Sequence, residues 1–102
     1  MFHALEKLAV MHDGYLKAFY VGGRQLLLVQ AHGQRYLLQN VCPHRGLPLD
    51  GGRIADHVLR CPAHGFEFSL LDGENLNPAL RDCGALQFYP LAYEGQQCGI
   101  YR

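Results

Sequence analysis

Two short cysteine–histidine pairs constrain this chain more than any other feature of its sequence. The first is Cys42-Pro43-His44 and the second is Cys61-Pro62-Ala63-His64, and sixteen residues separate them. Glycine follows closely in both cases, as Gly46 in the first and as Gly65 in the second. Thiolate and imidazole are ligands for soft and borderline metals. Two loops that each present one cysteine and one histidine therefore make a four-ligand set. We therefore expect the rest of the chain to be a scaffold for these two loops.

Length and composition restrict that scaffold to one small domain, residues 1–102, with room for one core. No apolar run approaches the roughly 18 residues that a membrane helix needs, and no secretory signal is visible at the N-terminus. Nine basic and nine acidic residues cancel, and they form no basic stripe of the kind that binds nucleic acid. We predict a cytoplasmic protein that binds neither membrane nor nucleic acid.

The four cysteines fall into two classes. Cys42 and Cys61 stand beside histidines in matching Cys-Pro contexts, which a simple disulfide does not require, so metal binding is the better interpretation. Cys83 and Cys98 have no such neighbours. We expect these two to be ordinary buried or half-buried thiols, with a mutual bond as the alternative.

The pattern before Cys42 predicts a three-stranded meander. The segments Tyr15–Val21, Arg24–Ala31 and Arg35–Val41 are rich in Tyr, Leu, Val and Phe. Gly22-Gly23 and His32-Gly33 divide them and suit tight hairpin turns. The meander leads directly into Cys42, so the ligand loops are expected to extend from the end of a sheet.

Further strands are predicted on both sides of this region. Residues 1–12 indicate a short opening strand and a loop, and Glu74–Gly84 indicates an irregular connection. The remaining predicted strands are His57–Arg60, Phe66–Leu71, and a final hairpin of Ala85–Tyr93 with Gln97–Tyr101. Pro90 interrupts the last hairpin and suggests an edge or a bulge. The chain is therefore predicted to be an all-β domain of about eight to ten short strands, a small sandwich or barrel.

The ligand spacing resembles the signature of Rieske-type iron–sulfur proteins, C-x-H followed by C-x-x-H. The resemblance extends to G-F-E-F after the second loop, to residues 72–78 and to residues 89–95. It implies a [2Fe–2S] cluster in a two-loop subdomain at about residues 42–68, with Cys42 and Cys61 on the inner iron and His44 and His64 on the outer iron. A zinc site is the alternative, but zinc pairs usually have at least two residues between ligands, and the first pair here has one.

Four departures from the high-potential members of this family are visible. Those members carry additional loop cysteines and a serine and a tyrosine that bond to sulfur, where this chain has Leu47, Ala63, Phe66 and Phe68. Fewer hydrogen bonds to sulfur stabilise the reduced cluster less. We predict a reduction potential near the bottom of the Rieske range, roughly −150 mV.

The resemblance implies a soluble one-electron carrier and not an enzyme in its own right. Its partners would be a flavin-dependent NAD(P)H reductase and a terminal oxygenase, as for ferredoxins of ring-hydroxylating oxygenases. The alternatives are a small subunit of an assimilatory nitrite reductase and a zinc-stabilised interaction module. We expect partners to dock weakly and transiently at the tip formed by His44 and His64. The other residues expected there are Pro43, Leu47, Pro48, Leu49, Pro62 and Phe66, with Pro78 from a third loop; Phe68 is expected in the core.

Overall fold

The computed structural model of the chain describes residues 1–78 and 83–102. Its ten strands form three antiparallel sheets. The first sheet contains, in spatial order, β1 (Phe2–Lys7), β10 (Gln97–Tyr101) and β9 (Ala92–Glu94). The second contains β2 (Leu16–Val21), β3 (Arg24–Ala31), β4 (Gln34–Gln39) and β8 (Phe88–Tyr89). The third contains β5 (Arg53–Ala55), β6 (Val58–Arg60) and β7 (Glu67–Ser69).

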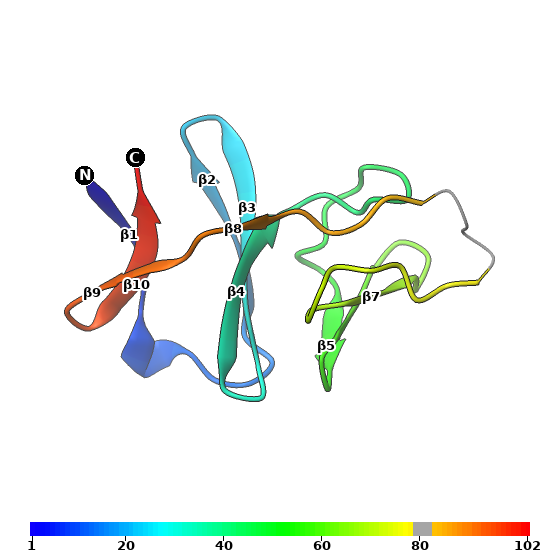
Figure 1. The fold of residues 1–102 in the computed structure, drawn as a ribbon, viewed down its shortest axis with the longest axis horizontal. Coiled ribbons are helices and arrows are strands. Elements are labelled where there is room, and N and C mark those ends of the chain that lie inside the picture. The colour runs from blue at the N-terminus through cyan, green and yellow to red at the C-terminus, as the bar shows by residue number, and fades with distance from the viewer. Residues whose placement is uncertain (79–82) are drawn as a thin grey trace.

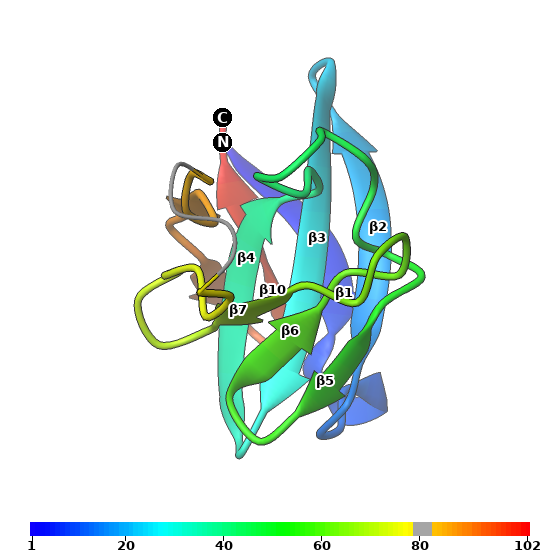
Figure 2. The same cartoon turned by 90° about the vertical axis from the view of Figure 1, so that its right-hand side faces the viewer.

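The three sheets follow one another along the long axis of a molecule that measures 43 × 28 × 20 Å (Figure 1). The first sheet lies with both termini at one end, and the third sheet lies at the other end with the two ligand loops. Seen from that end, the third sheet lies in front of the second (Figure 2). The prediction of an all-β domain with eight to ten short strands is confirmed, and the layers number three.

The two predicted tight turns of the meander are present. Val21 pairs with Arg24 and Ala31 pairs with Gln34, so each turn has two residues. All four turn residues have positive φ, including His32 at 50°. This is the conformation of type I′ turns, whose twist matches that of the flanking strands.

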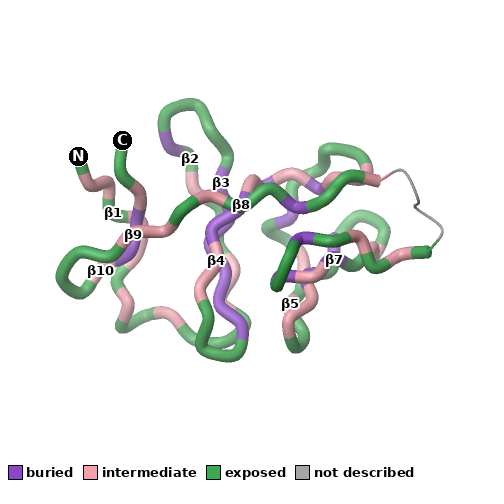
Figure 3. The backbone as a smooth tube through the Cα atoms, viewed as in Figure 1, coloured by how far each residue is buried: buried purple, intermediate pink, exposed green. Residues whose placement is uncertain are grey.

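Strand β3 separates two cores because it is buried on both faces. Leu27 and Val29 face the third sheet, whereas Leu26 and Leu28 face the first. The run of four apolar residues in β3 thus belongs to a strand covered on both sides, and the purple segments in Figure 3 concentrate there. The expectation of one core was wrong, since the middle sheet divides the buried residues into two groups.

We call these groups the loop-side core and the terminal-side core. The loop-side core contains Leu27, Val29, Ala31, Leu38, Cys42, Leu49, Leu59, Cys61, Phe68, Leu70 and Leu86. The terminal-side core contains Val21, Leu26, Leu28, Leu37 and Cys98, with partly buried neighbours that include Leu5 and Ile100. The prediction that Phe68 is a core residue is confirmed, since its side chain is fully buried.

Three sequence expectations need correction. The predicted hairpin of Ala85–Tyr93 with Gln97–Tyr101 is split at Pro90: β8 pairs with β4 in the second sheet, and only β9 pairs with β10. Proline has no N–H to donate, so the ladder stops and the chain changes sheets there. The predicted strand over Phe66–Leu71 is only Glu67–Ser69, because the Phe66 carbonyl accepts from the second ligand loop.

The third correction is strand β5, which the sequence analysis missed. Three residues are too few to show an alternation that predicts a strand. Elsewhere the opening strand is confirmed, followed by a short 3₁₀ turn at Leu8–Val10. The predicted irregular connection over 74–84 lies partly outside the described residues. No helix in the described part of the chain is long and apolar enough to cross a membrane.

Candidate metal centre

The two ligand loops share one backbone frame. In each loop the cysteine N–H donates to the carbonyl five residues on, and the cysteine carbonyl accepts from the glycine N–H four residues on. The bonds are Cys42 to Leu47 at 2.7 Å, Gly46 to Cys42 at 2.7 Å, Cys61 to Phe66 at 2.7 Å and Gly65 to Cys61 at 2.9 Å. The frame is the same although the histidine is the second residue after Cys42 and the third after Cys61.

A left-handed glycine closes each frame. Gly46 has φ of 73° and Gly65 has φ of 70°, a conformation that costs other L-residues roughly 1–2 kcal/mol. This explains why glycine stands four residues after each cysteine. The two glycines identified in the sequence therefore shape the loops through their backbone and offer no side chain as a metal ligand.

A buried asparagine anchors the first loop to the middle sheet. Asn40, just after β4, is 3% exposed. Its Oδ1 accepts a hydrogen bond from the Leu49 N–H at 2.7 Å, and its Nδ2 donates to Asp50 Oδ1 at 3.2 Å. The start and the end of the first loop are thus tied together, a role that sequence reasoning did not assign to this residue.

The two cysteines lie on the inner side of the loops. Cys42 and Cys61 are both 1% exposed and belong to the loop-side core. Burial raises the pKa of the Cys42 thiol, and the adjacent Cys61 side chain raises it further. The backbone N–H groups of His44 and Arg45 act in the opposite direction, since they donate to the Cys42 sulfur and lower that pKa. The first ligand loop therefore supplies backbone N–H donors to the Cys42 sulfur. Neither ligand loop, 42–47 or 61–66, contains a hydroxyl side chain that could donate to it.

The two histidines lie on the outer side. The His44 ring is half-buried, and the His64 ring is exposed. Their centroids are 5.6 Å apart and their planes are nearly perpendicular, at 85°. Phe66 contacts both rings, with centroid distances of 4.4 Å to His44 and 5.7 Å to His64. The two thiols thus lie together on the inner side of the loops, and the two imidazoles lie together on the outer side.

The donor atoms fit a two-iron centre. His44 Nδ1 is buried and has no hydrogen-bond partner, and buried polar atoms without a partner are rare in proteins. A metal ion would satisfy this nitrogen. Within residues 1–78 and 83–102, no three His, Cys, Asp or Glu side chains converge on one metal position. A single zinc ion needs four such ligands, whereas each iron of a two-iron centre needs only two from the protein.

Two further histidines and the other two cysteines lie outside this constellation. His57 stacks on His32 at 4.4 Å and 17°, at the turn of the β5–β6 hairpin opposite the end that leads to Cys61. All four cysteines are free, and Cys98 contacts Met11 in the terminal-side core. The expectation that Cys83 and Cys98 are ordinary thiols is therefore confirmed.

Only some of the residues predicted at the docking tip are exposed. Leu49 was expected on the docking surface but is fully buried, because it packs in the loop-side core while its N–H bonds to Asn40. Leu47 is 41% exposed, and Pro48 and Pro62 are exposed as expected. Phe66 is half-buried against the histidines.

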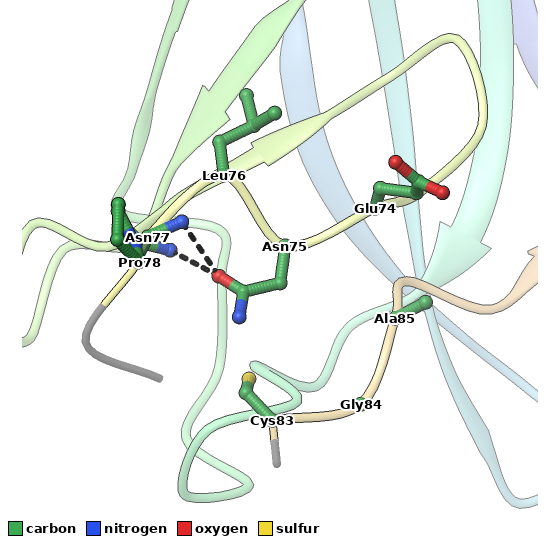
Figure 4. Close-up of a pocket in the computed structure, with 8 residues that line it drawn as sticks. All are labelled: Glu74, Asn75, Leu76, Asn77, Pro78, Cys83, Gly84 and Ala85. Atoms are coloured by element: carbon green, nitrogen blue, oxygen red, sulfur yellow. Dashed lines mark hydrogen bonds between the residues drawn. The ribbon is translucent and has the colours of Figure 1, made fainter. Parts of the chain in front are cut away.

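A third segment borders the first ligand loop. Pro78 lines a pocket of about 520 Å³ whose opposite wall is Cys83 and Gly84 (Figure 4). Asn75 Oδ1 fixes one wall by accepting from both nitrogens of Asn77, at 2.8 and 2.7 Å. A Cβ atom at Gly84 would lie 3.8 Å from Pro43, so this segment packs beside the first loop. A role for Pro78 beside the metal centre stays a prediction.

Comparison with protein families accounts for these features together. The Rieske [2Fe-2S] domain matches residues 2–90. The chain belongs to the Rieske [2Fe-2S] family. The cofactor of the family is the [2Fe-2S] cluster, which the mixed thiol and imidazole donors described above fit. The resemblance found in the sequence is thereby confirmed.

Similar proteins include ferredoxin components of oxygenase systems. The chain is 39% identical over 84 residues to the alkene monooxygenase system ferredoxin component of Xanthobacter autotrophicus, covering 81% of this chain and 66% of that protein. It is 27% identical over 89 residues to the naphthalene 1,2-dioxygenase system ferredoxin component of Pseudomonas aeruginosa, covering 86% and 83%. A stretch of 64 residues is 33% identical to human apoptosis-inducing factor 3 but covers only 11% of that protein.

Solved structures establish the fold. The ferredoxin of Sphingomonas yanoikuyae B1 superposes with a TM-score of 0.85, at 22% identity, over 100% of this chain and 99% of that one. The ferredoxin of carbazole 1,9a-dioxygenase from Nocardioides aromaticivorans superposes with a TM-score of 0.80, at 22% identity, over 96% and 94%. The three small sheets are therefore the Rieske fold.

Proposed function

We propose that this protein is a one-electron carrier of an oxygenase system, receiving electrons from a flavin-dependent NAD(P)H reductase and passing them to a terminal oxygenase. The observation that carries the proposal is the convergence of two buried thiols and two outer imidazoles on matching loop frames. The similarity to ferredoxin components of monooxygenase and dioxygenase systems supports it. A related ferredoxin has also been solved in complex with the oxygenase of carbazole 1,9a-dioxygenase.

We assign the ligands as Cys42, His44, Cys61 and His64, within a subdomain at about residues 42–68 of a single domain, 1–102. The cluster, when bound, supplies a one-electron redox couple. The buried cysteines would hold the inner iron in the loop-side core. The histidines would hold the outer iron, and the exposed ring of His64 would connect it with the surface.

The protein's own contribution is to hold these donors rigidly. Proline fixes φ next to both cysteines, and both loops are closed by the same pair of backbone bonds. Phe66 contacts both rings, which restricts the imidazoles. A rigid donor set limits the structural change when the electron arrives or leaves. Four free cysteines support a cytoplasmic location, where thiols stay reduced.

The test is anaerobic purification, reduction with dithionite, and EPR beside iron and sulfide analysis. We expect a rhombic signal with about two irons and two sulfides per chain. His64→Ala should abolish the signal, whereas His32→Ala, outside the donor set, should keep it. Colourless protein with zinc and without sulfide would refute the carrier. Stable co-purification with a larger catalytic chain would instead favour an enzyme subunit, such as that of a nitrite reductase.

A further inference from the structure

Two arginines face each other beside the second ligand loop. Arg53 and Arg60 are direct partners across the β5–β6 ladder, so their side chains leave the same face of the third sheet. Like charges directly opposite one another destabilise a sheet. Both residues are exposed, and the fold gains nothing evident from this pairing.

Neither guanidinium has a partner among residues 1–78 and 83–102. No carboxylate of the described residues lies within ion-pair distance of Arg53 or Arg60, and neither side chain makes a hydrogen bond to the part of the chain that the structure describes. The cations of the second sheet behave differently, because each packs over an aromatic ring. These pairs are Lys17 with Phe19, Arg24 with Tyr89 and Arg35 with Tyr93.

The two arginines line a cleft of about 530 Å³ that reaches the ligand loop. Its walls are Gly51, Gly52, Arg53, Arg60, Cys61, Pro62, His64 and Gly65. No carboxylate is among these lining residues. The guanidinium of Arg60 lies against Gly65, since a Cβ atom there would be 2.9 Å from it. The positive charge is therefore held directly beside the loop that carries His64.

The nearest acidic residues do not neutralise this cleft. Glu67 is the cross-strand partner of Arg60 on β7 but makes no ion pair with it. The Asp50 carboxylate accepts a hydrogen bond from Asn40. Asp56 lies at the far turn of the hairpin, 3.4 Å from His32.

We propose that this cleft is the docking site for carboxylates of an acidic redox-partner protein. The inference rests on the proposed function, because the cleft adjoins the imidazole through which the electron would leave. Charge complementarity identifies the partner: two unpaired guanidiniums without a carboxylate attract Asp and Glu side chains. Exposed Pro62 beside them and Leu47 on the first loop supply the apolar contact that such an interface also needs.

The test uses poly-L-glutamate as the acidic probe and the cluster-loaded protein. Because the net charge of the chain is zero, binding of this probe requires a local positive site. We expect binding at low ionic strength that weakens steeply as salt is added. Arg53→Glu should weaken it by about tenfold or more, whereas Arg53→Lys, which keeps the charge, should change it little. Arg24→Glu makes the same charge change in the second sheet and should leave the affinity near that of the wild type.

Three outcomes would overturn the proposal. One is absence of poly-L-glutamate binding to the loaded wild-type protein. Another is an equal loss of affinity in Arg24→Glu and Arg53→Glu. The third is one-to-one binding of inorganic phosphate in this cleft without binding of poly-L-glutamate, which would assign the cleft to a small anion. EPR on the same samples distinguishes these results from failure of the proposed electron-carrier function. A protein that lacks the cluster gives no EPR signal, whereas a cluster-loaded protein that does not bind poly-L-glutamate gives the signal without the binding.

Discussion

The ring of Phe66 lies 4.4 Å from the ring of His44 and meets it edge-on at 74°, although the two residues belong to different ligand loops. Phe66 follows Gly65 in the second loop, and its carbonyl also accepts the Cys61 N–H. One residue therefore closes its own loop with its backbone and restrains the ligand of the other loop with its side chain. This contact connects the two halves of the metal centre.

Removing this ring should loosen the centre. Edge-to-face aromatic pairs contribute about 0.5–1.5 kcal/mol, and Phe66→Ala also removes half-buried surface. We expect a loss of about 1–3 kcal/mol, measured as a lower midpoint for thermal loss of the visible absorbance. Phe66→Tyr, which keeps the ring, is the control. Equal midpoints for Phe66→Ala and the wild type would show that His44 does not depend on this contact.

The two loop glycines offer a matched comparison. Both have nearly the same positive φ, but a Cβ at Gly46 would meet nothing within 4 Å, whereas one at Gly65 would meet the guanidinium of Arg60. Gly46→Ala should cost about 1–2 kcal/mol from backbone strain alone. Gly65→Ala should cost only slightly more, because the end of the exposed Arg60 side chain can move aside, and this small excess should disappear in an Arg60→Ala background. The measurement is urea unfolding of Gly46→Ala, Gly65→Ala, Arg60→Ala and the double variant Gly65→Ala/Arg60→Ala. Equal losses of stability for the two glycine variants, with no dependence on Arg60, would contradict the contact between Gly65 and Arg60.

Asn40 should matter more than its exposed partner. In Asn40→Ala the Leu49 N–H, which is buried, loses its acceptor, and an unsatisfied buried donor costs about 1–3 kcal/mol. Asp50→Ala removes only the other bond of Asn40, and Asp50 is exposed. We therefore expect a clearly larger loss of stability for Asn40→Ala in denaturant unfolding. The reverse order would mean that the first loop is not anchored through this residue.

Asp13 should make stability depend on acid pH. The Gly33 N–H and, second, the Gln30 side chain donate to its carboxylate and hold its pKa below the ordinary value of 3.8. A carboxyl group whose pKa is lower in the folded state stabilises the fold above its ordinary pKa, and this contribution is lost as the pH falls through the folded-state pKa. Asp13→Asn keeps an acceptor oxygen but cannot titrate.

The measurement is the thermal midpoint of wild type and Asp13→Asn, followed by circular dichroism from neutral to acid pH. The wild type should be the more stable of the two at neutral pH, and the difference should shrink as the pH drops below 3.8. A difference that stays constant down to strongly acid pH would mean that the carboxylate is not stabilised by these bonds. Asp72→Asn, in an exposed turn, provides a comparison for a charge change elsewhere.

Local signals explain where sequence reasoning succeeded. The turns at residues 22–23 and 32–33 have glycine at positions of positive φ, and the apolar run of β3 is long enough to identify a central strand. The failures came where signals are short or compete. Strand β5 has three residues and little alternation, and Pro90 moves the chain from one sheet to another instead of bending a hairpin. In both places the structure depends on which strand the segment pairs with, and the local sequence does not show that partner.

The chemistry of this protein follows from local features of its sequence. Ligand types, their spacing and the glycine after each pair are local properties, and they identify the Rieske family without coordinates. The surroundings of the metal centre, in contrast, depend on how distant segments pack. It buried Leu49, brought Phe66 of one loop against His44 of the other, and set Arg53 opposite Arg60 in a cleft without carboxylates. The reason is that burial, ring contacts and strand register depend on which segments pack against each other. When those segments are far apart in the chain, the local sequence does not show which of them will be in contact.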